Sequence, residues 1–189
     1  TSLGDWVVNE EKLPGGLAPL IDRVEAEGLK FGIWFEPEMI SPDSDLFRAH
    51  PDWHVHVADR TPMLGRNQYV LDVSRADVRD AVWAQMEKVL SSGHIAYLKW
   101  DFNRNITDAG SALLPPERQK EAAHRYMLGV YALFEWFCGH FPHAMIENCS
   151  GGGGRYDLGM MHYSTQIWES DNTYPEARIY SQYGSTLAY

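Results

Sequence analysis

The sequence contains little cysteine: Cys138 and Cys149 are the only two in 189 residues. Two cysteines do not make the disulfide framework of a small secreted protein, and they fit a reducing compartment. No apolar run approaches the roughly 20 residues that a membrane-spanning helix needs, and the chain as given opens without a signal peptide. We therefore expect a cytoplasmic protein with no membrane segment.

Basic residues are also scarce, with 16 Lys and Arg against 26 Asp and Glu, which gives a formal net charge of −10. Such a surplus of negative charge repels nucleic-acid phosphates and anionic lipids, so neither is expected as a partner. Aromatic side chains are plentiful in contrast, with seven Trp and ten Tyr. They fit an ordinary protein core, and they also fit a site on which sugar rings stack.

Motifs that bind cofactors or metals are missing as well. The eight His include no His-Glu-x-x-His pair, and Cys149 has no Cys or His near it at ligand spacing, so we expect no metal. The run Gly151–Gly154 lacks the Gly-Lys-Ser/Thr ending of a phosphate loop, which leaves a flexible loop or a close approach to a ligand. No orienting His–Asp partner can be named for Cys149 as a nucleophile. We expect no cofactor.

Apolar residues recur at helical spacing in three places. The first helix is predicted over 17–24, with Gly28 as its C-cap. The second is predicted to start at Ser74, with Asp77 completing a capping box, and to end near Gly93. The third opens at 115–117 and is long. The expected inner faces are Leu17, Leu20, Ile21 and Val24 in the first helix, Val78, Val82, Met86 and Val89 in the second, and Tyr126, Met127, Val130, Phe134 and Phe137 in the third.

Between these helices lie short apolar runs that predict strands, at 29–35, 95–100, 144–148 and 164–168, with a brief extended piece at 69–72. Residues 1–16 are expected to form a loop, and 37–67 a long connection of the kind that is usually functional in a compact domain. Strands that alternate with helices indicate βαβ units and a parallel sheet. The fold class is therefore expected to be α/β.

Polar residues follow each of the four main strands. An open doubly wound sheet gathers its site at one switch point, whereas a (β/α)8 barrel draws site residues from many strand ends. The second pattern is present here, and because a barrel typically takes about 250 residues, we predict a partial (β/α)8 barrel. The polar residues at the ends of the four units are Glu36 and Glu38, then Lys99, Asp101 and Asn103, then Asn148 and Cys149, and last Glu169 and Asp171.

Asp101 is the first candidate for a reacting group, because it ends the apolar strand at 95–100; the alternative is an Asp that caps the following turn. Strand alternation sends Lys99, Asp101 and Asn103 to one face. Lys99 would then hold Asp101 ionised by its opposite charge, and both flanking side chains could bind sugar hydroxyls. Carboxylates on different strand ends suit glycoside hydrolysis, which uses one as nucleophile or base and one as acid.

Five segments of the chain resemble motifs of the α-galactosidases of glycoside hydrolase family 36, in the family's order and over nearly the whole chain. One matching segment would only suggest the family, whereas five segments in the same order are highly specific for it. The segments are Phe31-Gly-Ile-Trp-Phe-Glu-Pro-Glu-Met39, Gly65-Arg-Asn-Gln-Tyr-Val-Leu-Asp72, Tyr97-Leu-Lys-Trp-Asp-Phe-Asn-Arg104, Glu147-Asn-Cys-Ser-Gly-Gly-Gly-Gly-Arg155 and Trp168-Glu-Ser-Asp-Asn-Thr173.

The resemblance implies a retaining α-galactosidase acting on melibiose- and raffinose-type α-1,6-galactosides, with Asp101 as nucleophile and Asp171 as general acid/base. It implies an oligosaccharide with terminal α-galactose as substrate and a homo-oligomeric full-length protein. Glu36, Glu38 and Glu147 are implied as supporting carboxylates. The implied sugar-binding residues are Trp34, which packs against the galactose, with Arg66, Lys99, Asn103, Cys149, Gly151 and Gly152.

The sequence also departs from the family pattern. The Asp-Asp-Gly-Trp strand expected before Ser2 is absent, as are the final barrel strands, so residues 1–189 are expected to be a single piece of the catalytic domain, roughly barrel strands 3 to 6 with their helices. Tyr174 stands where an acidic residue is expected. An α-N-acetylgalactosaminidase or a raffinose-type galactosyltransferase with the same catalytic pair stays open, as does an inactive sugar-binding fragment. Expressed alone, these 189 residues are expected to be insoluble or inactive.

Overall fold

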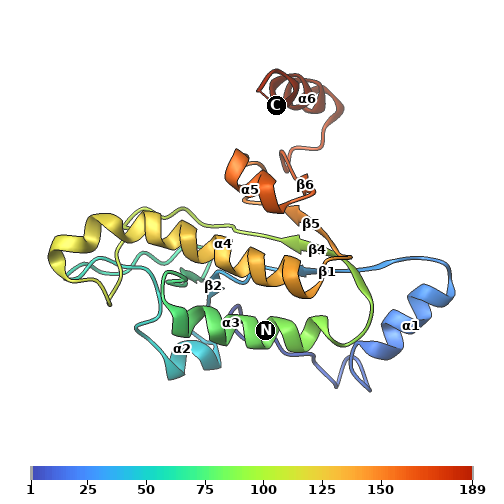
Figure 1. The fold of residues 1–189 in the computed structure, drawn as a ribbon, viewed down its shortest axis with the longest axis horizontal. Helices are drawn as coiled ribbons and strands as arrows, with labels where there is room; N and C mark the ends of the chain where they lie inside the picture. Colours follow the sequence, from blue (N-terminus) through green and yellow to red (C-terminus); the bar gives the residue numbers. More distant parts are fainter. Residues whose placement is uncertain (1, 189) are drawn as a thin grey trace.

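The chain forms an α/β structure around a four-stranded sheet (Figure 1). This computed structural model describes residues 2–188, without the side chain of residue 188. The strands are β1 (Phe31–Phe35), β4 (Ile95–Trp100), β5 (Met145–Asn148) and β6 (Gln166–Ile167), all parallel and hydrogen-bonded in the order β1-β4-β5-β6. The α/β prediction is confirmed, and this order, in which each new strand joins the last one without a reversal, agrees with the predicted partial barrel.

Two long helices cover one face of the sheet, α3 (Ala76–Leu90) and α4 (Ala122–His140), and Figure 1 shows them side by side. Their buried faces meet the outward side chains of β4: the ring of Trp100 stacks on Phe134 with centroids 4.4 Å apart. Each large side chain buried in this layer stabilises the fold by about 1.5–3 kcal/mol. All four residues of the predicted inner face of α3 are buried. The predicted inner face of α4 is buried as well, except for Met127, which is partly buried.

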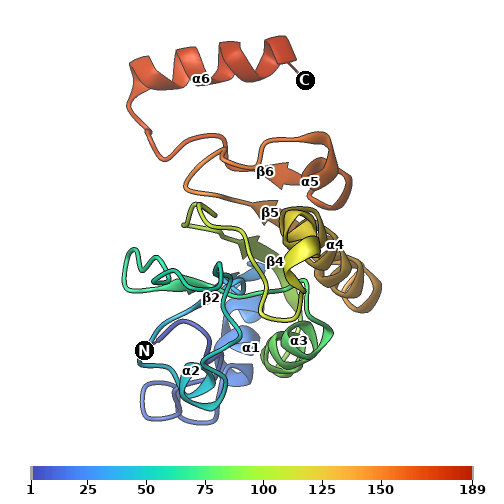
Figure 2. The same ribbon diagram turned by 90° about the vertical axis from the view of Figure 1, so that its left-hand side faces the viewer.

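The smaller helices frame this core. Helix α1 (Ala18–Ala26) has Glu27 as its C-cap, one residue before the predicted Gly28, which ends the helix with a φ of 75° and a hydrogen bond to Glu25 O (2.9 Å). Leu20, predicted to lie on its inner face, is exposed. Helix α4 is preceded by a 3-10 helix, η1 (Pro116–Glu121), where a continuous helix was predicted. Helices α5 (Leu158–Tyr163) and α6 (Pro175–Ala188) follow β5 and β6, and α6 projects away from the sheet in both views (Figure 2).

The segment predicted as one long connection at 37–67 contains two elements that sequence patterns missed. These are β2 (Met39–Ile40), which pairs antiparallel with β3 (Tyr69–Val70), and the short helix α2 (Asp45–Ala49). Both elements are too short to show a periodicity. The loop predicted at the N-terminus is confirmed over 2–16; residue 1 lies outside the described residues. The last predicted strand is confirmed only at 166–167, where β6 pairs with β5.

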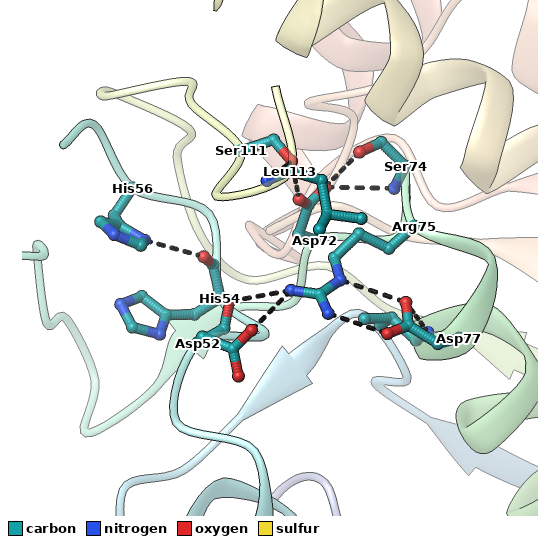
Figure 3. Close-up of polar contacts among 10 residues, drawn as sticks. Asp52, His54, His56, Asp72, Ser74, Arg75, Asp77, Ser111 and Leu113 are labelled. Atoms are coloured by element: carbon teal, nitrogen blue, oxygen red, sulfur yellow. Dashed lines mark hydrogen bonds and ion pairs between the residues drawn. The ribbon is translucent and has the colours of Figure 1, made fainter. Parts of the chain in front are cut away.

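Arg75 fixes the long connection to the start of α3 (Figure 3). Its buried guanidinium donates to Asp52 Oδ2 (2.8 Å) and makes a forked pair with Asp77 (3.1 and 2.8 Å). The capping box predicted for Ser74 and Asp77 is wrong for this reason: the Asp77 carboxylate is engaged by Arg75, and the Ser74 hydroxyl donates to Asp72. Arg75 itself occupies the N-cap position, with no side-chain cap.

Candidate active site

The site is built on the face of the sheet that α3 and α4 leave open, here called the open face. Strand register aligns one residue from each strand across it: Trp34 beside Lys99, Lys99 beside Glu147, and Glu147 beside Gln166. Because side chains alternate along a strand, the apolar neighbours of these residues point instead into the helix-covered core. The next residue of the same parity along the chain is Asp101, which directly follows β4.

Asp101 is buried and fully engaged by donors. Its Oδ2 accepts from Asn103 Nδ2 (2.7 Å) and Trp34 Nε1 (3.1 Å), and its Oδ1 accepts from the backbone N–H of Phe102 (2.9 Å). Burial acts to raise the pKa of Asp101, but the hydrogen bonds from Asn103, Trp34 and the Cys149 thiol outweigh it, so the pKa lies below its ordinary value. The carboxylate is therefore held in its ionised form, and its neighbours come from β1, β4 and the end of β5.

Lys99 acts on Asp101 only at longer range, and its direct partner is Glu147. Its Nζ forms an ion pair with Glu147 Oε1 at 2.9 Å and lies 4.7 Å from the ring centre of Trp168. The direct partners of Asp101 are the neutral donors described above. Asn103 does contact Asp101, as predicted. Glu147 is also bound by Gln166 Nε2 (2.7 Å), so Lys99 is held in a fixed row of side chains across the open face.

Glu36 holds the backbone of Asn103 by a hydrogen bond. Its Oε1 accepts from the Asn103 backbone N–H at 2.8 Å and from Gln68 Nε2 at 3.2 Å. Burial raises the pKa of Glu36, with Asp101 adding to the rise and the bonds from Asn103 and Gln68 opposing it. This carboxylate therefore ties the end of β1 to the segment that carries the Asp101 partners.

Glu38 forms a second, fully buried support. It accepts from Trp100 Nε1 (2.9 Å), from the Tyr126 hydroxyl, and from Arg155 Nη1 at 2.9 and 3.1 Å. Arg155 in turn lies over the ring of Phe102, with its guanidinium carbon 4.5 Å from the ring centre. One carboxylate thus joins the ends of β1 and β4, helix α4 and the end of the glycine run.

The glycine run after β5 follows a backbone path that suits glycine. Gly151 and Gly152 have positive φ values of 55° and 89°, which side chains rarely adopt. A Cβ on Gly153 would lie 2.7 Å from the carbonyl oxygen of Glu169, so the loop packs directly on the segment after β6. Cys149, just before the run, is buried beside Asp101, and burial raises the pKa of its thiol to about 11.

Asp171 lies in this segment after β6, exposed to solvent, and its Oδ1 accepts from Trp168 Nε1 at 2.9 Å. Gly152 is its backbone neighbour, because a Cβ there would lie 3.3 Å from the Asp171 nitrogen. The second predicted carboxylate is therefore on the same edge of the sheet as Asp101, next to the glycine run.

A cleft of about 650 Å³ opens along this edge. It brings together three of the predicted sugar-binding residues, Arg66, Asn103 and Gly151, which lie far apart in the sequence. Sequence reasoning assigned no role to Gln68, Arg104 or Trp168, although all three lie inside the five quoted segments. Strand parity would have found Trp168, since it stands two residues after Gln166. No comparable signal marks Gln68 and Arg104, whose contacts depend on the path of a loop.

The arrangement offers an ionised, buried carboxylate, a second carboxylate nearby on an exposed segment, and hydrogen-bond donors around a cleft. Within residues 2–188, no three His, Cys, Asp or Glu side chains are grouped so as to hold a metal ion. No helix of that region has the length and apolar character needed to cross a membrane.

The Melibiase family model matches residues 1–189. The chain is 54% identical over 188 residues to the α-galactosidase AgaA of Geobacillus stearothermophilus, and 52% identical over 189 residues to α-galactosidase 1 of Pediococcus pentosaceus. In both cases the match covers 100% of this chain and 26% of the relative, so the chain spans about a quarter of their length.

Solved structures agree with the sequences. The crystal structure of AgaA superposes with a TM-score of 0.95 at 54% identity, covering 98% of this chain and 26% of that one. A variant of AgaA in complex with raffinose superposes with a TM-score of 0.96, covering 100% and 26%. A family match over every residue, together with relatives above 50% identity along the whole chain, shows that this chain belongs to the Melibiase family.

Proposed function

We propose that the protein carrying this chain is a retaining α-galactosidase that hydrolyses terminal α-galactosyl residues of melibiose- and raffinose-type sugars, and that residues 1–189 are part of its (β/α)8 catalytic domain. The observation that carries the proposal is Asp101: a buried carboxylate with a lowered pKa, held by donors from three strand ends and followed directly by two residues that line the cleft, Phe102 and Asn103. The relatives named above are α-galactosidases, and one was crystallised with raffinose.

The relative AgaA also supports the choice of the two aspartates. Its complexes with raffinose and with stachyose each carry one aspartate substitution. The two substituted positions are separated by the same number of residues as Asp101 and Asp171. Substituting a catalytic carboxylate is a usual way to trap an uncleaved substrate, and this spacing therefore favours Asp101 and Asp171 as the catalytic pair.

In the proposed mechanism, a carboxylate oxygen of Asp101 attacks the anomeric carbon while the bond to the leaving oxygen breaks. Asp171 donates its proton to that oxygen, and the galactosyl group remains as an ester on Asp101. Asp171 then takes a proton from a water molecule, the water oxygen bonds to the anomeric carbon, and the ester bond breaks. Galactose is released, and both carboxyl groups return to their initial states.

The surrounding residues bind the sugar and fix its orientation. Arg66, Asn103 and Gly151 line the cleft, where N–H donors can hold the sugar hydroxyls. Trp34 is 41% exposed on the open face while its N–H is bound to Asp101, so the exposed part of its ring can pack against a galactose. Lys99, Cys149 and Gly152 complete the proposed sugar-binding set.

The test is Asp101→Ala in the full-length protein, assayed on an aryl α-galactoside with and without azide. Turnover is expected to fall nearly to zero and to return with azide, which replaces the missing nucleophile and yields a galactosyl azide. Full turnover without azide would contradict the assignment of Asp101. A wild-type enzyme that prefers α-N-acetylgalactosaminides, or that transfers galactose to sugar acceptors instead of water, would contradict the proposed substrate or reaction while leaving the mechanism standing.

A further inference from the structure

The turn that carries Arg66 has an unusual backbone. Gly65 and Gln68 exchange both backbone hydrogen bonds, at 3.3 and 3.0 Å, and the two residues between them, Arg66 and Asn67, have φ values of 53° and 57°. Two successive positive φ angles define a type I′ turn, which favours Asn-Gly or Gly-Gly because side chains are disfavoured there. A long arginine at its first central position is therefore held against the local preference of the chain.

Strained backbone of this kind persists only where its surroundings fix it, and such positions gather at ligand sites. Arg66 is exposed at the cleft that Asn103 and Gly151 share, and its guanidinium has no hydrogen bond or ion pair within the part of the chain that the structure describes. The strained turn thus presents a cation with unused donors to the cleft.

Arg104 is the residue that fixes this turn. Its guanidinium donates to three carbonyl oxygens on it or just before it: Met63 O at 2.9 Å, Gly65 O at 3.3 Å, and Gln68 O. Contact is so close that a Cβ on Gly65 would lie 3.1 Å from Arg104 Nε. A planar guanidinium can reach several carbonyls at once, which a lysine ammonium on its flexible stem cannot do.

Arg104 also has a fixed position of its own, since it directly follows Asn103, whose backbone N–H is held by Glu36. Gln68, the last residue of the turn, donates to the same Glu36 carboxylate at 3.2 Å. The turn is therefore tied to the end of β4 through two connections, the Arg104 guanidinium and the Glu36 carboxylate.

We propose that Arg104 is a positioning residue that acts through Arg66: it locks the type I′ turn in its left-handed form and so aims the Arg66 guanidinium at the bound sugar. The inference rests on the proposed function, because the cleft is taken to be the galactose site. It assigns to Arg104 no contact with substrate.

A double-mutant cycle tests this relationship. In the full-length protein, KM for an aryl α-galactoside and Kd for 1-deoxygalactonojirimycin are measured for wild type, Arg104→Lys, Arg66→Ala and the double variant. Arg104→Lys is expected to raise both constants by about tenfold, the size of one charge-assisted hydrogen bond, with a much smaller effect on kcat. In the Arg66→Ala background, Arg104→Lys should have no further effect, since the group that it positions is gone.

Two further variants separate positioning from a general effect on folding. Asn67→Gly relieves the strain at the second central position of the turn, so it should restore part of the affinity lost in Arg104→Lys. Arg60→Lys is the matched control: Arg60 lies in the neighbouring loop but makes only an exposed ion pair with Asp108, and both constants should stay within twofold of wild type.

An unchanged KM and Kd in Arg104→Lys would overturn the inference, and so would equal losses in the wild-type and Arg66→Ala backgrounds, which mark a structural role alone. A wild-type protein that binds 1-deoxygalactonojirimycin but hydrolyses no α-galactoside would contradict the proposed function, while the Kd values still decide the role of Arg104. A wild-type protein that binds no such ligand would overturn both.

Discussion

The indole N–H of Trp34 donates to Asp101 Oδ2 across the β1–β4 pair at 3.1 Å, although the two residues are 67 positions apart in the sequence. The parallel register places Trp34 beside Lys99, and the Trp34 ring reaches Asp101, two residues further along the chain on the same face. A residue expected to pack against the sugar is therefore also a donor to the proposed nucleophile. The two roles can be separated by experiment.

Trp34→Phe keeps a ring but removes the N–H donor. Because the donors hold the pKa of Asp101 below its ordinary value, loss of one raises that pKa, and the acidic limb of kcat/KM should move to higher pH by about one unit. The donors stabilise the fold above the unfolded pKa of Asp101, and this stabilisation disappears as the pH falls through the lower folded pKa, so the variant should also be less stable at neutral pH. Trp6→Phe, which alters a ring packed against Trp34 but no bond to Asp101, should leave the limb in place.

Asp171→Ala should separate natural from activated substrates. A nitrophenyl leaving group needs little proton donation, whereas the sugar oxygen of raffinose needs it, so the loss of activity should be about 100-fold or more greater on raffinose. Steady-state rates on both substrates measure this ratio. Glu169→Gln, which changes a carboxylate two residues away that is bound to Ser185, should affect the two substrates alike. Equal losses in Asp171→Ala would argue against its role as the acid.

Glu38→Gln should destabilise the fold strongly. The substitution leaves Arg155 as a charged group with 11% of its side chain exposed and no opposite charge, and breaking a buried pair in this way costs about 3–5 kcal/mol. Urea denaturation measures the change in the free energy of unfolding. Glu121→Gln removes the partner of two exposed arginines, Arg118 and Arg125, and should have far less effect, because water screens an exposed ion pair. Similar losses of unfolding free energy in the two variants would show that the Glu38–Arg155 ion pair does not stabilise the fold more than an exposed one.

Two glycines of helix α4 should respond in opposite ways to alanine. A Cβ on Gly129 would lie 1.9 Å from the carbonyl oxygen of Val73, so Gly129→Ala must push α4 away from the segment before α3 and should cost about 3 kcal/mol or more. No atom lies within 4 Å of a Cβ on Gly139, and alanine there should be neutral or stabilise the helix by up to about 1 kcal/mol. Thermal unfolding of the two variants, compared with wild type, checks both signs.

Sequence periodicity predicted the elements that are long enough to have one. The stripe from Val78 to Val89 is buried as predicted, and so is the inner face of α4 except for Met127, which is partly buried. Gly28 has the positive φ of a helix-ending glycine, although the C-cap itself is Glu27. Periodicity could not find β2 or α2, because two or five residues carry no repeat. It misplaced the start of α3, where the side chain of Arg75 competes for Asp77 through a contact that also involves distant Asp52.

The candidate site was predictable to the extent that strand parity and motifs determine it. Parity placed Lys99, Asp101 and Asn103 on one face, and the structure agrees. Parity could not predict which carboxylate pairs with Lys99. The partner is Glu147 on the adjacent strand, because the strand register places the two residues side by side. The strained turn at Arg66 and its connection to Arg104 depend on a loop path that no local pattern encodes.

The pairing of Lys99 with Glu147 has an electrostatic consequence. Because each of these two charges has its opposite within 2.9 Å, they contribute little net potential to the open face, and every hydrogen bond to the Asp101 carboxylate comes from a neutral donor. The sugar ring in glycoside hydrolysis becomes positively charged in the transition state. A negative potential fixed in place before the substrate binds attracts that developing charge, and this chain creates it by neutralising its own lysine.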